Sequence, residues 1–151
     1  MLNTLEIRTA TLADAAVIAG LIIDTAQACF GKDAPPFINT LSPAILELSL
    51  HNPCYYYVLG LLGTEVVGVA ALRDYQHVYH LFVSTSYQRR GIARALWQFL
   101  MNAATAKGTR EFTVNASLYS VPAYLKFGFS PSGDTQIYNG IQYLPMQLTP
   151  T

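Results

Sequence analysis

The stretch Ser84-Thr85-Ser86-Tyr87-Gln88-Arg89-Arg90-Gly91-Ile92-Ala93 is the most informative part of this sequence. An apolar run, residues 77–83, precedes it, and a run with helical spacing, residues 92–107, follows it. A strand that stops at a short polar loop, which then opens a helix on Gly, leaves free backbone N–H groups pointing at one place. The positive end of the helix dipole points there too, and such a helix start binds phosphate.

Positive charge gathers around this loop, from Arg89, Arg90 and Arg94. Elsewhere the charges balance, because Lys+Arg and Asp+Glu both total 9 and the formal net charge is zero. The overall balance therefore favours neither a nucleic-acid partner nor an acidic membrane. A local cluster of arginines at a helix start instead predicts a small polyphosphate ligand.

The composition predicts one globular domain that spans residues 1–151. The chain is 52% hydrophobic and 12% charged, which is well below the usual charged share of about a quarter. We therefore expect some apolar surface to serve as a ligand pocket or an interface, and a homodimer is compatible with this composition.

The cysteines and the N-terminal region indicate a cytoplasmic protein. Cys29 and Cys54 lack metal-ligand or redox spacing and are interpreted as reduced core or pocket residues. The first residues lack the basic and apolar regions of a signal peptide. The longest apolar run nearby, residues 15–23, is far shorter than the ~20 residues that a membrane span needs.

Hydrophobic periodicity predicts alternating strands and helices. The predicted strands are residues 5–8, 55–61, 65–73, 77–83, 111–114, 137–138 and 141–143. The predicted helices begin near Thr11, Ser42, Ile92 and Ser120, and they end near Gly31, Leu50, Gly108 and Gly128. Residues 31–40, with Pro35-Pro36, are interpreted as a loop. Gly63-Thr64 and Asn139-Gly140 predict tight hairpins. This order predicts an α/β fold (α+β mixed sheet), with a central, mostly antiparallel sheet and helices on both faces.

Two motifs at this spacing resemble the GNAT superfamily, the acyl-CoA-dependent N-acyltransferases. Residues 88–93 fit the superfamily's signature Gln/Arg-x-x-Gly-x-Gly/Ala, and residues 124–129 match its second motif, Tyr-x-x-x-Gly-Phe. The similarity runs from about residue 5 to residue 148. It implies a GNAT-like fold, acetyl-CoA as co-substrate and direct attack of a primary amine on the thioester.

The resemblance also implies a set of site residues. Backbone groups of Leu81, Phe82 and Val83 would bind the pantetheine arm and the acetyl oxygen. The pyrophosphate would be bound by Gln88, Arg89, Arg90, Gly91, Ile92, Ala93 and Arg94. Ser117 would contact CoA, and Tyr124 would be the general acid, since a phenol with a pKa near 10 can donate a proton to a thiolate.

The general base is predicted as His77 or ordered water. Some members of the superfamily carry a Glu or His eleven residues before the glycine loop, and His77 stands there. Alternation along a strand would put Tyr79 and Leu81 on the same face as His77, and His80 on the other face in a structural role. The three histidines lack a metal-ligand pattern, so no metal is predicted.

The acceptor is predicted to be a small-molecule or peptide amine. Helices near the N-terminus, residues 31–40 and the middle strands would build its pocket, and an aromatic set lies there: Tyr55, Tyr56, Tyr57, Tyr75 and Tyr79. A non-catalytic acyl-CoA-binding module or sensor is the alternative, although it would not need Tyr124. A nucleic-acid-binding domain is disfavoured by the zero net charge.

Overall fold

The fold is described for residues 4–150 of a computed structural model. Within these residues one sheet has the order β1-β2-β3-β4-β5-β8-β6, and β7 pairs with β8. The strands are β1 (Leu5–Thr9), β2 (Tyr55–Leu62), β3 (Glu65–Arg73), β4 (His77–Val83), β5 (Phe112–Ser117), β6 (Ser130–Pro131), β7 (Gln136–Tyr138) and β8 (Ile141–Leu148). Of the pairings, β4 with β5 is parallel and the others are antiparallel, which confirms the predicted mixed sheet.

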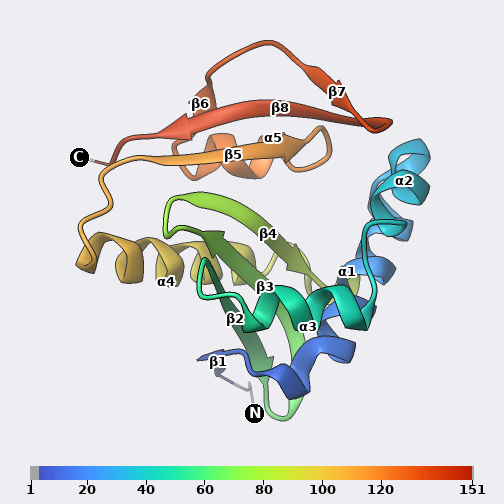
Figure 1. The fold of residues 1–151 in the computed structure, drawn as a ribbon. Helices are drawn as coiled ribbons and strands as arrows, with labels where there is room; N and C mark the ends of the chain where they lie inside the picture. Colours follow the sequence, from blue (N-terminus) through green and yellow to red (C-terminus); the bar gives the residue numbers. More distant parts are fainter. Residues whose placement is uncertain (1–3, 151) are drawn as a thin grey trace.

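Helices cover both faces of the sheet (Figure 1). They are α1 (Ala15–Cys29), α2 (Ala34–Ile38), α3 (Pro43–His51), α4 (Ile92–Ala106) and α5 (Val121–Lys126). One core cluster joins α1 and α3 to β2 and β3. The second cluster joins α4 and α5 to the opposite face. The prediction of helices on both faces is therefore confirmed.

The prediction that residues 31–40 form a loop is wrong, because α2 lies within them. Pro35 and Pro36 stand at the first turn of this helix. Proline is tolerated there, since the N–H groups of a first turn have no partner inside the helix. The two prolines therefore begin a helix here.

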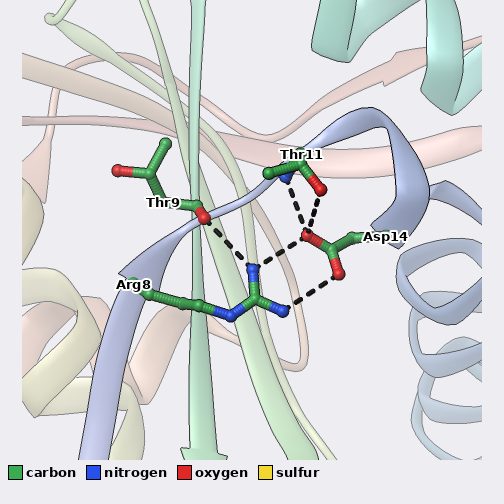
Figure 2. Close-up of polar contacts among 4 residues, drawn as sticks. All are labelled: Arg8, Thr9, Thr11 and Asp14. Carbon is green, nitrogen blue, oxygen red and sulfur yellow. Dashed lines mark hydrogen bonds and ion pairs between the residues drawn. The ribbon is translucent and has the colours of Figure 1, made fainter.

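The junction between β1 and α1 is held by Arg8 and Asp14 (Figure 2). The two side chains form a bidentate ion pair, with N–O distances of 2.9 and 3.0 Å. Asp14 also accepts a hydrogen bond from the Thr11 N–H at 2.7 Å, as part of a capping box at this helix start. The Arg8 guanidinium holds the pKa of Asp14 at about 2, below its ordinary value.

Helix α1 is strongly apolar. By length and composition alone, residues Leu12–Cys29 could span a membrane. In this fold the helix packs on the sheet and contributes Ile18 and Ile22 to the core, both with no exposed surface. A core helix meets the same criterion.

A bulge in β4 is the feature of the sheet that matters most for the site. Ala71 of β3 lies opposite His80, while Leu72 lies opposite Val78, so Tyr79 is an extra residue in β4. A bulge bends its strand and changes which face the following side chains occupy.

Strands β4 and β5 separate at the same point. They pair at only two positions, His77 with Thr113 and Val78 with Val114. Strand β4 continues to Val83 and β5 continues to Ser117 without pairing to each other. The sheet therefore opens into a slot between these two strands.

Candidate functional site

Main-chain groups of β4 line the slot. The Ser84 N–H donates to the Val67 carbonyl of β3, so this register directs the main-chain groups of Phe82 toward β3 as well. The groups of the intervening residues, Leu81 and Val83, point away from β3 and into the slot. Leu81 and Val83 therefore have main-chain groups free to meet a ligand, as expected. The main-chain groups of Phe82 are directed to β3, and Phe82 contributes to the cavity lining.

A cavity of about 100 Å³ lies at the inner end of the slot. Its walls come from β4, from β5 and the start of α5, from the beginning of β8 and from the region of α1 and α2. They consist of Phe30, Phe37, Val78, Tyr79, His80, Leu81, Phe82, Val114, Asn115, Ala116, Ser117, Ser120, Tyr124, Ile141, Gln142 and Tyr143. The cavity therefore brings together Leu81, Phe82, Ser117 and Tyr124 from the predicted set.

Tyr124 presents a protonated phenol to this cavity. Its side chain is 5% exposed, and burial raises the pKa of its hydroxyl above the ordinary value. The hydroxyl makes no hydrogen bond within residues 4–150, yet no buried side-chain polar atom in this part of the chain lacks a partner. The hydroxyl must therefore reach the space of the cavity.

The loop before α4 has the geometry of an anion site. Gly91 is the N-cap residue with a φ of 81°, and no side chain caps this helix end. The N–H groups of Ile92, Ala93 and Arg94 consequently have no partner inside the helix. Arg89 also has a positive φ, 65°, and alternation of this kind makes a concave nest of N–H groups. A Cβ built on Gly91 would meet no atom within 4 Å. Glycine is therefore favoured here by the left-handed backbone and not by a close contact.

Gln88 connects the loop to both sides of the slot. Its Nε2 donates to the Val83 carbonyl at 2.9 Å. Its Oε1 accepts from the Tyr119 hydroxyl, also at 2.9 Å, on the segment that follows β5. The Ser117 hydroxyl lies 2.7 Å from that of Ser120. No sequence signal pointed to Tyr119.

The arginines near the loop have different surroundings. The Arg90 guanidinium lies over the Tyr87 ring, with 5.2 Å to the centroid. Arg94 instead lies over the Phe127 ring and reaches the Lys126 carbonyl. Its side chain is thus directed toward the end of α5, although its N–H belongs to the open start of α4.

His77 lies at the start of β4 and does not line the cavity. Its Nδ1 is 2.8 Å from the Thr113 hydroxyl, and burial lowers the pKa of its imidazole. The prediction that His77, Tyr79 and Leu81 share one face is wrong. Leu81 packs on the α4 side of the sheet, whereas Tyr79 packs on Tyr55 on the α1 side. The Tyr79 bulge, which alternation cannot reveal, is the cause.

His80 is the histidine that does line the cavity. Its Nδ1 lies 3.1 Å from the Tyr57 hydroxyl, and its ring lies 4.5 Å from that of Tyr79. Burial lowers the pKa of the imidazole to about 4, so the ring is neutral at pH 7. His80 is predicted to have a structural role away from the site, but it lines the cavity.

The predicted aromatic set divides between the two faces. Tyr79 lines the cavity, and Tyr55 and Tyr57 pack on that side of the sheet. Tyr56 and Tyr75 stack on each other against the α4 cluster, away from it. Within residues 4–150, no group of three or more His, Cys, Asp or Glu side chains could hold a metal ion.

One family model matches most of the chain. A family profile described as "Acetyltransferase (GNAT) domain" matches residues 25–150. Human N-acetyltransferase 8 is 28% identical over 98 residues; the match covers 58% of this chain but only 43% of the human protein.

Solved structures share the fold across the whole chain. A GCN5-related N-acetyltransferase from Rhodopseudomonas palustris superposes with a TM-score of 0.87 at 22% identity, covering 99% of this chain and 98% of that one. The PaiA N-acetyltransferase from Thermoplasma acidophilum, solved in complex with coenzyme A, gives a TM-score of 0.83 at 15% identity, covering 97% and 99% of the two chains.

Proposed function

Because the chain belongs to the GNAT acetyltransferase family, we propose that it moves an acetyl group from acetyl-CoA to a primary amine of a small molecule or peptide. One observation carries the proposal: the slot between β4 and β5 joins an open helix start at one end to the Tyr124 hydroxyl at the other. A long ligand with an anionic end and a reactive end matches that arrangement.

The chain's own groups fit acetyl-CoA along this path. The free N–H groups of Ile92, Ala93 and Arg94, with Arg89 and Arg90 beside them, suit a pyrophosphate. The main-chain groups of Leu81 and the N–H of Val83 suit the amide-bearing pantetheine arm. When bound, acetyl-CoA supplies a thioester whose acetyl group is already activated.

Transfer forms the bond between the amine nitrogen and the acetyl carbon and breaks the bond between that carbon and sulfur. Tyr124 donates a hydrogen bond to the sulfur as negative charge develops there. Because its raised pKa exceeds the ordinary thiol value of about 8.5, the phenol stays protonated until the sulfur departs. His77 has no place in this scheme, and the surplus proton of the amine passes to water.

The experiment compares Tyr124→Phe with the wild-type protein. Release of free CoA thiol is followed at saturating acetyl-CoA over a panel of amines, and acetyl-CoA affinity is measured separately by calorimetry. Loss of a group that assists proton transfer should lower kcat by about a hundredfold or more and leave the acetyl-CoA Kd nearly unchanged.

Tyr138→Phe is the matched control, since it removes a phenol from an exposed position on β7. Equal turnover by wild type and Tyr124→Phe would remove Tyr124 from the mechanism. Tight acetyl-CoA binding without thiol release for any amine would identify a sensor in place of an enzyme.

A further inference from the structure

Three phenylalanines form one wall of the cavity. The ring centroids of Phe30 and Phe37 are 5.3 Å apart, and those of Phe37 and Phe82 are 5.8 Å apart. The residues come from three elements: the end of α1, α2 and β4. His80 extends the cluster, with its ring 5.8 Å from that of Phe82. Residues of β5 and α5, Tyr124 among them, also line the cavity.

Among residues 4–150, no Asp, Glu, Lys or Arg side chain lines the cavity. His80 is neutral at pH 7, because burial lowers its pKa to about 4, and the Tyr57 hydroxyl beside it is also uncharged. Moving an ammonium ion from water into such a space is costly without a counter-charge. Cation–π attraction returns only about 2 kcal/mol, and it needs an open ring face. The faces of Phe37 and Phe82 are turned toward each other, with 28° between their planes.

Beside the cavity, the turn of the β7–β8 hairpin meets α2, as Figure 1 shows. A Cβ built on Gly140 would lie 3.6 Å from the Cβ of Pro36, which is ordinary contact. Gln142 and Tyr143 continue from this turn into the cavity wall. At about 100 Å³ the space suits a compact group better than a long flexible chain.

We propose that the acceptor is an aromatic amine, bound as the uncharged free base with its ring against Phe30, Phe37 and Phe82. This inference rests on the proposed acetyl transfer at the same site. An amino group attached directly to an aromatic ring is unprotonated at neutral pH, so it needs neither a counter-charge nor removal of a proton before attack. In the transfer, one N–H proton of the amine goes to water, the departing sulfur takes the proton of the Tyr124 hydroxyl, and water returns a proton to that oxygen. Polyamines and aminoglycosides, which carry several ammonium groups, would bury unpaired charge.

The first test is a panel of four amines at saturating acetyl-CoA, with thiol release as the signal. The pair 4-methoxyaniline and benzylamine differs mainly in the charge of the nitrogen at pH 7. The pair benzylamine and cyclohexylmethylamine differs in the ring, and 1,4-diaminobutane carries two charges. We expect kcat/KM to fall in that order, with at least about a tenfold drop from 4-methoxyaniline to benzylamine, equivalent to 1.4 kcal/mol. Equal or higher kcat/KM for benzylamine or 1,4-diaminobutane would overturn the inference.

Two variants test the aromatic wall and the lack of a counter-charge in the cavity. Gln142→Glu places a carboxylate in the lining at nearly constant shape, and it should raise kcat/KM for benzylamine relative to 4-methoxyaniline by about tenfold. Phe37→Leu removes a ring but keeps apolar volume, and it should raise KM for 4-methoxyaniline while the acetyl-CoA Kd stays the same. Unchanged amine preference in both variants would contradict the inference.

Binding of 4-methoxyaniline to the protein–CoA complex, measured by calorimetry, separates this inference from the proposed function. Binding without acetylation of any amine would remove the proposed function and keep the aromatic site. Acetylation of alkylamines without binding of 4-methoxyaniline would keep the function and remove the aromatic site.

Discussion

At the scale of single residues, His80 and Tyr57 form a neutral pair between β4 and β2. Burial acts in opposite directions on the two groups: it lowers the pKa of the imidazole and raises that of the phenol. Both effects favour the uncharged form at pH 7. The rings of Tyr57, Tyr79 and Phe82 lie beside His80, and burial is the cause of its lowered pKa. The pair can therefore stay buried only while His80 is neutral.

This arrangement predicts a pH dependence of stability. In the unfolded chain the pKa of His80 is near 6.5, while in the folded protein it is about 4. Between these values the unfolded state binds more protons, so the contribution of His80 is complete above pH 6.5 and is lost as pH falls toward 4. The loss should approach about 3 kcal/mol in the free energy of unfolding.

Urea unfolding of the wild type and of His80→Gln at pH 7.5 and pH 4.5 checks this. The carboxyl groups titrate in both proteins, so the difference between the two falls isolates His80. We expect a smaller fall for His80→Gln. Equal falls in the two proteins would mean that folding does not lower the pKa of His80.

At the scale of elements, two glycines set the distance between α4 and the sheet. Gly60 of β2 and Gly68 of β3 lie opposite each other in the strand register. The Leu96 side chain of α4 fills the space that their missing Cβ atoms leave, and Leu96 has no exposed surface. Because α4 begins directly after Gly91, the packing of α4 on the sheet also positions Gly91.

Gly68→Ala tests this seating. The new Cβ would lie 2.8 Å from Leu96 Cδ1 and 3.3 Å from the Phe82 carbonyl oxygen. Overpacking of this kind costs about 1–3 kcal/mol in the free energy of unfolding. The double variant Gly68→Ala/Leu96→Val should lose less than the sum of the two single variants.

Gly20→Ala is the control for this test. Gly20 lies inside α1 with no atom within 4 Å of a built Cβ, so alanine there should stabilise by about 0.5–1 kcal/mol. Additive losses in the Gly68 and Leu96 double variant would show that the contact does not limit the packing of α4.

Elements that depend on residues close in the chain can be predicted from the sequence, whereas strand register cannot. Periodicity and caps predict the long helices, the main strands and the two hairpins, because these depend on residues close in the chain. The Tyr79 bulge depends on how β4 registers against β3, which no local pattern encodes. Because of that one residue His80 shares a face with His77 and lines the cavity, whereas His77 lies where β4 still pairs with β5. The loop at Gly91 and Tyr124 lie in short motifs, so local sequence alone is enough to propose them as site residues.

At the scale of the whole molecule, the slot divides the sheet into two parts. Strands β1–β4 form one part and β5–β8 the other, joined in the sheet by the two residue pairs of β4 and β5. The hydrophobic core on the α4 face connects the two parts, with Trp97 of α4 packed against Phe112 and Phe129. A ligand that fills the slot would contact both parts. Its binding energy should therefore appear as stability of the entire fold.

Coenzyme A should accordingly raise the melting temperature of the protein. At a concentration a hundred times its Kd, a ligand that binds only the folded state adds about 2.7 kcal/mol. For a chain of this length that corresponds to a shift of about 5–10 °C in Tm. Gly91→Asp should abolish the shift, because its carboxylate faces the same N–H groups as the phosphates. Gly91→Asn is the matched control: asparagine has nearly the same shape and tolerates the left-handed backbone without adding charge. A shift that survives in Gly91→Asp, measured by differential scanning calorimetry beside Gly91→Asn, would show that the pyrophosphate binds elsewhere and that the start of α4 is not the anion site.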